Sequence, residues 1–247
     1  MIEDDIPELK PNVSLSELLE FADGLTVERN KKCFPTISDR VDHLVLGGAE
    51  LSNAVRAEDI KILPKVASKV VLRIFTVLQG LGEKDAIVQE LMDKFPANGC
   101  SYCGKKPCQC AVDRPTGKAD IRPSEFQKEW TIGDWQVHLY EVYGEGNAAK
   151  GLTWIANRLT SEIAEVVQAR MLMDMQTMEE GRKKYKREAI NELADSFAWA
   201  VAVCTFVDGD LETEFIERYG KGCANCKKYP CQCGAFSFKE ERKLNVL

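Results

Sequence analysis

The sequence predicts an all-α protein that consists of two helical-bundle repeats, each with a small four-cysteine metal knuckle. Three observations lead to this prediction. Apolar residues recur at helical spacing, for example at Leu152, Ile155, Leu159, Ile163 and Val166. Pairs of carboxylates stand three residues apart beside these apolar stripes. Eight of the ten cysteines form two copies of the pattern C-x2-C-x4-C-x-C.

The cysteine pattern marks an internal repeat. Cys100 lies 123 residues before Cys223, and the other three pairs keep the same offset. The surrounding residues agree, since the first copy reads GCSYCGKKPCQC and the second reads GCANCKKYPCQC. Further upstream, GGAELSNAV aligns with TSEIAEVV, which places Glu50 over Glu162. Repetition of this kind predicts two copies of one structural unit of about 110 residues.

These features divide the chain into five segments. The linker between the repeats is recognised by the proline and glycine residues of AVDRPTGKADIRP. The expected boundaries are a leader at 1–13, a first repeat at 14–110, the linker at 111–123, a second repeat at 124–233 and a tail at 234–247.

Hydrophobic periodicity and capping residues place the helices within each repeat. In the first repeat a helix begins near Leu15 behind a serine cap, and residues 23–39 are expected to form a loop. Further helices are expected at 40–57, 60–80, 84–95, 124–144, 147–175, 182–207 and 210–219. The helix at 124–144 is rich in aromatic rings, which either pack in the core or include one that stacks on a base.

The two cysteine knuckles are expected to bind zinc. The N-terminus shows no secretory signal, and in that setting closely spaced cysteines are typical of metal ligands rather than disulfides. Four thiolates within eleven residues can complete a tetrahedral Zn²⁺ site. Disulfides and an iron site are the alternatives. The expected ligands are Cys100, Cys103, Cys108 and Cys110 in the first knuckle, and Cys223, Cys226, Cys231 and Cys233 in the second.

Four carboxylates predict a second kind of metal site, namely Glu162, Glu165, Glu192 and Asp195. The spacing within each pair puts both side chains on one helix face, one turn apart. If the two apolar stripes pack together, the four acids converge, and close anions repel one another unless a cation lies between them. Oxygen ligands favour Mg²⁺ or Mn²⁺. The alternative is that these acids belong to solvated helix faces.

The first repeat keeps only one of the four acids. Glu50 aligns with Glu162, but Asn53 stands where the second repeat has Glu165, and the stretch from 60 to 82 contains no Asp or Glu. Lys65 and Lys69 lie in that stretch instead. The first repeat is therefore expected to retain the fold without the carboxylate metal site.

The order E-x-x-E, then 26 residues, then E-x-x-D resembles the MazG-like all-α nucleoside triphosphate pyrophosphohydrolases. The phrase NELADSFAWAV is similar to that family's second metal helix. The resemblance covers about residues 122–220, with a weaker copy in the first half, and it assigns the four acids to the catalytic metal. A further Glu that is usual in the family is Ser161 here. Since such domains work as dimers, the tandem repeat implies an intramolecular pseudo-dimer, with further homo-oligomerisation expected.

The resemblance also implies a reaction. A nucleoside triphosphate, either NTP or dNTP, is cleaved to the monophosphate and pyrophosphate by a metal-activated water. One of the acids can act as the base, with Glu165 and Glu192 as candidates. A basic residue near the start of the second metal helix contacts phosphate in the family, which points to Lys186 or Arg187 in the run GRKKYKRE.

The net charge of the chain bears on which other functions are compatible with the sequence. A net charge of −6 argues against broad nucleic-acid binding and against anionic membranes, and a cytoplasmic location is expected. A nucleotide-sensing or scaffold subunit with little hydrolysis is one alternative function. A nucleic-acid-binding protein that uses the lysines of the knuckles is another. The preferred base and sugar, and a role in pool cleaning, dUTP removal or defence, do not follow from the sequence.

Overall fold

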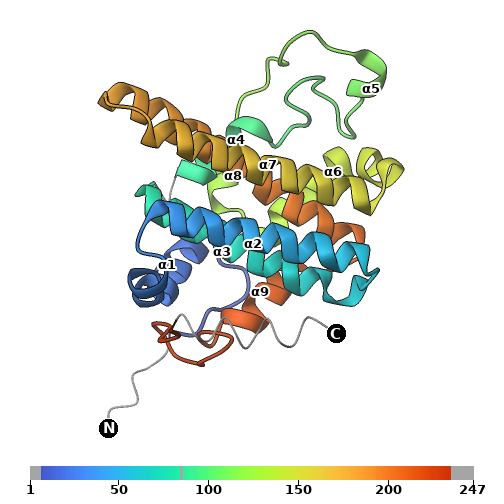
Figure 1. Ribbon diagram of the computed structural model, residues 1–247. Helices are drawn as coiled ribbons and strands as arrows, with labels where there is room; N and C mark the ends of the chain where they lie inside the picture. The colour runs from blue at the N-terminus through green and yellow to red at the C-terminus, as the bar shows by residue number, and fades with distance from the viewer. Residues whose placement is uncertain (1–6, 84–85, 235–247) are drawn as a thin grey trace.

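The computed structural model describes residues 7–83 and 86–234. Within these ranges the chain forms helices joined by turns and loops, and no β-strand is present. Four long helices pack against one another at the centre (Figure 1). The all-α prediction is therefore confirmed for this part of the chain. The central helices are α2 (Ile37–Arg56), α3 (Leu63–Leu81), α7 (Leu152–Asp174) and α8 (Glu179–Phe206).

The remaining helices cover this bundle. Capping boxes at Ser14, Thr36 and Thr131 fix where α1, α2 and α6 begin, because each hydroxyl accepts a hydrogen bond from the backbone N–H three residues later. The other α-helices are α1 (Leu15–Cys33), α4 (Ala86–Lys94), α5 (Cys110–Asp113), α6 (Ile132–Lys150) and α9 (Leu211–Tyr219), with 3-10 helices at Ile60–Ile62 and Glu125–Glu129.

The prediction of a loop at 23–39 is wrong, because α1 continues to Cys33 and α2 begins at Ile37. Gly24 lies inside α1, where Tyr229 packs directly over it. A Cβ at Gly24 would lie 1.9 Å from the hydroxyl oxygen of Tyr229, so only glycine permits this close approach. Leu25 on the same turn is buried. Packing against a distant segment overrides the poor helix propensity of glycine here.

The expected helix at 124–144 is interrupted. A 3-10 helix covers Glu125–Glu129, and Trp130 then adopts an extended backbone conformation. The capping box at Thr131 starts a new helix, α6, which runs past the expected end to Lys150. Gly151 follows at φ 84°, a left-handed value that favours glycine and ends the helix.

The two halves of the chain exchange segments. From the N-terminal half, α4 packs on α8, and from the C-terminal half, α9 packs on α3. The two cysteine segments, knuckle 1 (Cys100–Cys110) and knuckle 2 (Cys223–Cys233), lie at opposite ends of the molecule (Figure 1). Buried apolar residues from both halves belong to one hydrophobic core.

Each knuckle is attached to the first long helix of the opposite half. In knuckle 1 the Cys108 N–H donates to the carbonyl of Val142 on α6 at 2.7 Å. In knuckle 2 the Cys231 N–H donates to the carbonyl of Leu25 on α1 at 2.8 Å. Cys108 and Cys231 are counterparts in the cysteine repeat, so the exchange is reciprocal.

The ends of the chain are described only in part. Leu9 is buried, and its N–H donates to the carbonyl of Gly220 at 2.9 Å, so part of the expected leader packs beside the end of α9. Residues 1–6 of that leader and 235–247 of the expected tail lie outside the described residues.

Among the described helices, none alone is long and apolar enough to cross a bilayer. Only α8 and α9 taken together have that length and composition, and a bend of 102° separates them.

Candidate active site

Three of the four expected acids lie together on adjacent helices. Because α7 and α8 pack against each other, Glu162 and Glu165 face Glu192, and ligand oxygens of the three lie within 4.8 Å of one another. Glu162 is buried, Glu192 is half-buried and Glu165 is exposed. Three carboxylates at this separation repel one another, and a hard cation between them would remove the repulsion. The arrangement suits an oxygen-ligated divalent ion.

Burial raises the pKa of two of the glutamates, Glu162 and Glu192. Burial raises the pKa of Glu162, the charge of Asp195 raises it further, and Arg158 acts in the opposite direction. Burial also raises the pKa of Glu192, against a hydrogen bond from Asn191. A bound divalent ion would favour the ionised form of both groups and so reverse these shifts.

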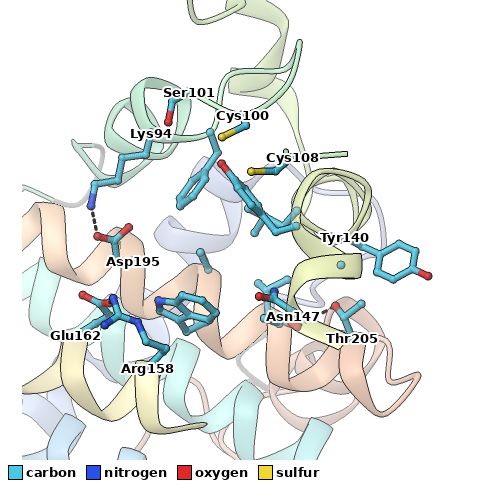
Figure 2. A pocket seen from close by; sticks show the side chains of 18 of the residues that line it. Lys94, Cys100, Ser101, Cys108, Tyr140, Asn147, Arg158, Glu162, Asp195 and Thr205 are labelled. Atoms are coloured by element: carbon cyan, nitrogen blue, oxygen red, sulfur yellow. Dashed lines mark hydrogen bonds and ion pairs between the residues drawn. The ribbon is translucent and has the colours of Figure 1, made fainter. Parts of the chain in front are cut away.

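Asp195 belongs to the same site but has a different partner. It forms an ion pair with Lys94, whose side chain is only 14% exposed (Figure 2). The Lys94 ammonium also donates to the carbonyl of Asn191 at 2.8 Å. Lys94 comes from α4, in the N-terminal half, so both halves of the chain build the site.

Arg158 is a site residue that the sequence analysis did not identify. Its guanidinium lies 2.5 Å from the Glu162 carboxylate, one turn away on α7. The same guanidinium lies 5.7 Å from the ring centre of Trp199 on α8, a cation–π distance. The i,i+4 spacing of Arg158 and Glu162 was the available sequence signal.

These side chains line a cavity of about 910 Å³. Its walls come from α4, knuckle 1, α6, α7 and α8 (Figure 2). All four expected acids reach it. The lining also includes basic residues and aromatic residues, namely Lys94, Lys118 and Arg158, and Phe95, Tyr102, Tyr140, Tyr143, Trp199 and Phe206.

The basic residues expected to contact phosphate have other positions. Lys186 forms an ion pair with Glu83 at 2.8 Å, and Arg187 is exposed on α8. Neither belongs to the residues that line the cavity. A role for Lys186 or Arg187 in phosphate binding stays a prediction, and Lys94 and Arg158 are the basic side chains paired with the acids.

In the N-terminal half, side-chain cations neutralise the one acid that aligns with the site. Glu50 forms ion pairs with Lys69 and with Arg73, whose Nη2 atom lies 3.5 Å from the carboxylate. All three side chains are less than a quarter exposed. Glu50 therefore has no need of a metal ion to balance its charge.

The sulfur atoms of each knuckle have the spacing of a tetrahedral site. In knuckle 1 they lie 3.6 Å apart for Cys100 and Cys110, and 3.9 Å apart for Cys103 and Cys108. The corresponding pairs of knuckle 2 lie at 3.7 and 3.9 Å. Four sulfurs about 2.3 Å from a central zinc would be about 3.8 Å apart. The described cysteines form no disulfide, and both clusters could bind a metal such as zinc.

The two knuckles share one backbone conformation. The Gly104 N–H donates to the carbonyl of Cys100 at 2.8 Å, and the counterpart bond joins Lys227 to Cys223 at 2.8 Å. Backbone N–H groups also donate to sulfur in both, from Gln109 to Cys103 at 3.3 Å and, in knuckle 2, from Gln232 to Cys226 at 3.4 Å. Such bonds stabilise thiolates and so favour metal binding.

No protein-family model, curated protein or solved structure matches this chain. A function for the protein must therefore be argued from the chemistry of the site.

Proposed function

We propose that the protein is a nucleoside triphosphate pyrophosphohydrolase that depends on Mg²⁺ or Mn²⁺ and converts an NTP or dNTP to the monophosphate and pyrophosphate. One observation carries the proposal: the oxygens of Glu162, Glu165 and Glu192 lie within 4.8 Å of one another at a cavity of about 910 Å³. Clustered carboxylates on facing helices of a bundle are a recurrent way to hold metal ions.

Each side chain has a defined role in this proposal. Glu162, Glu165 and Glu192 hold the ion, and Lys94 orients Asp195 beside them. A bound Mg²⁺ would balance phosphate charge and lower the pKa of a coordinated water. Lys94 and Arg158 supply positive charge at the same cavity, where they can balance charge that develops on the departing pyrophosphate.

The cavity suits a nucleotide. Binding pockets for small molecules commonly measure about 300–1,000 Å³ and combine apolar walls with a few polar groups. A divalent ion held by the acids, together with Arg158, would bind the triphosphate. Aromatic rings such as Tyr102 and Tyr143 line the same cavity and suit a base.

The fold proposal is a pair of MazG-like repeats that form an intramolecular pseudo-dimer. The reciprocal packing of α4 on α8 and of α9 on α3 supports it. The C-terminal repeat is catalytic, and the N-terminal repeat is the degenerate copy in which Lys69 and Arg73 neutralise Glu50. Both knuckles bind structural zinc, and further homo-oligomerisation and a cytoplasmic location stay predictions.

The test is a screen of the common NTPs and dNTPs with the purified full-length chain and Mg²⁺. We expect stoichiometric pyrophosphate and nucleoside monophosphate for at least one nucleotide, and no product when EDTA is present. Release of orthophosphate with a nucleoside diphosphate would show cleavage between the β- and γ-phosphates and would contradict the proposal. No product from any nucleotide would contradict it as well.

A nucleotide-sensing or scaffold function is the second candidate. Arg158 pairs with Glu162 and Lys94 pairs with Asp195, so two of the four acids are already neutralised by side chains of the chain itself. Nucleotide binding in calorimetry, without any hydrolysis, would favour this candidate. Nucleic-acid binding by the knuckles has less support, because Lys105 pairs with Asp113 and Lys106 pairs with Glu141.

A further inference from the structure

The two knuckles share one set of ligands and one backbone, but they differ in the residues between the cysteines. Ser101 and Tyr102 of knuckle 1 correspond to Ala224 and Asn225 of knuckle 2. The difference concerns residues that do not bind the metal. We therefore compare the surroundings of the two knuckles, which these residues contact.

Knuckle 2 is packed tightly against α1. The Tyr229 ring lies 5.2 Å from the ring of Phe21, and its hydroxyl donates to the Phe21 carbonyl at 3.4 Å. The same ring fills the space over Gly24, where a Cβ would clash with it. An aromatic side chain thus occupies the junction between knuckle 2 and its helix.

Knuckle 1 has no aromatic ring at that position. Lys106 is the counterpart of Tyr229, and it forms an ion pair with Glu141 of α6. Both partners are more than a third exposed, so this contact contributes little to stability. At the position that Tyr229 fills in knuckle 2, knuckle 1 has a surface ion pair in addition to the hydrogen bond from Cys108 to Val142.

Knuckle 1 also lines the cavity that contains the glutamates. Ser101, Tyr102 and the ligands Cys100, Cys108 and Cys110 are among the lining residues. Figure 2 shows the labelled knuckle residues across the cavity from Glu162 and Arg158. Tyr102 is 51% exposed although it is a large aromatic residue. Its ring is available to a ligand in the cavity.

We propose that knuckle 1 is part of the nucleotide-binding site and that Tyr102 contacts the base of a nucleotide whose phosphates lie at the glutamates. This inference rests on the proposed function for the identity of the ligand. Tyr102 stacks on the base, and stacking on an aromatic ring suits any base because each has a π-face. Knuckle 2 has a structural role only.

The test compares Tyr102→Ala with the matched control Asn225→Ala. Binding is measured by calorimetry for a nucleoside triphosphate and for inorganic triphosphate, which has no base or sugar, and KM and kcat are measured for the nucleotide. We expect Tyr102→Ala to weaken nucleotide binding and raise KM about tenfold, the effect of losing one stacking contact. Binding of inorganic triphosphate, and all values for Asn225→Ala, should stay unchanged.

Two further readouts separate a local effect from misfolding. Zinc content and the melting temperature of Tyr102→Ala should match those of the wild type. If the wild type binds nucleotide and Tyr102→Ala binds it equally well, this inference is overturned while the proposed function stands. If the wild type binds nucleotide through Tyr102 but hydrolyses none, the proposed function fails and this inference stands. If the wild type binds no nucleotide, both are overturned.

Discussion

Lys94 and Asp195 form an ion pair between α4 and α8, although 101 residues separate them in the chain. Lys94 belongs to the half that lacks a carboxylate site of its own. It reaches the other half because α4 packs on α8. The N-terminal half is therefore a structural component of the candidate active site, through Lys94 and through knuckle 1.

The first prediction concerns this ion pair. Lys94→Ala leaves the half-buried Asp195 without its cation and adds one uncompensated negative charge beside the three glutamates. We expect unfolding free energy to fall by about 1–3 kcal/mol, as for a partly buried pair that loses one partner. Hydrolysis should fall by at least tenfold. Urea denaturation and pyrophosphate release measure the two effects.

Lys128→Ala is the matched control for Lys94→Ala. Lys128 pairs with Glu125, which is 85% exposed, and such surface pairs contribute about 0–1 kcal/mol. This variant should keep both stability and activity. If Lys94→Ala retained wild-type kcat and KM, the N-terminal half would have no part in the reaction through this residue.

The second prediction concerns the knuckles. Purified protein should contain about two zinc ions per chain, because each of the two knuckles offers four sulfurs at tetrahedral spacing. Chelation should destabilise both halves, since knuckle 1 is attached to α6 and knuckle 2 to α1. Elemental analysis and thermal melting with and without a chelator measure this. Protein without zinc or iron and with eight oxidised cysteines would contradict it.

The third prediction concerns Gly24. In an exposed helix interior, Gly→Ala usually stabilises by about 0.5–1 kcal/mol. At Gly24 the added Cβ would lie 1.9 Å from the Tyr229 hydroxyl oxygen, so the Tyr229 side chain must leave its place against α1. We expect Gly24→Ala to lower unfolding free energy by about 1–3 kcal/mol, the usual cost of overpacking. Denaturant unfolding monitored by circular dichroism measures it.

Gly146 supplies the opposite case on α6. It is exposed, and a Cβ there would meet no atom within 4 Å. Gly146→Ala should therefore stabilise the protein by about 0.5–1 kcal/mol. Equal effects of the two substitutions, in either direction, would show that Tyr229 does not press against α1 in solution.

Several of these features could be predicted from the sequence because they depend on local spacing. Apolar stripes predict helices, and the i,i+3 interval puts Glu162 and Glu165 on one face. The cysteine spacing predicts clustered sulfurs. Each of these patterns lies within a few turns of chain, where geometry is fixed by the backbone.

Other features depend on contacts between distant segments and had no local signal. The loop expected at 23–39 is largely helix, and Gly24 within it packs against Tyr229, far along the chain. Lys94 reaches Asp195 only because α4 crosses to the other half. Whether Lys186 faces a ligand or a neighbour such as Glu83 likewise depends on how the elements pack. Sequence periodicity identifies helix faces but does not identify their partners.

The last prediction concerns the chemistry. Glu192→Gln keeps the size of the side chain and removes one negative charge from the glutamate cluster. A hard cation should bind much more weakly when one of its carboxylates becomes an amide. We expect Mg²⁺-dependent pyrophosphate release to fall by about a hundredfold or more, because the metal-activated water is lost. Without metal the fold should be as stable as the wild type or more so, since repulsion among the acids is relieved.

Glu50→Gln is the matched control, because Glu50 aligns with a site glutamate but pairs with Lys69 and Arg73. This substitution leaves two poorly exposed cations without their carboxylate, so it should reduce stability by about 1–3 kcal/mol. Hydrolysis by the folded protein should stay nearly unchanged, because this acid holds no metal. The two variants thus differ in opposite senses: Glu192→Gln loses activity and keeps its stability, whereas Glu50→Gln keeps activity and loses stability. If Glu192→Gln hydrolysed nucleotides as fast as the wild type, the glutamate cluster would not be the active site. If Glu50→Gln abolished hydrolysis while folded, a composite site that includes Glu50 would replace the one described.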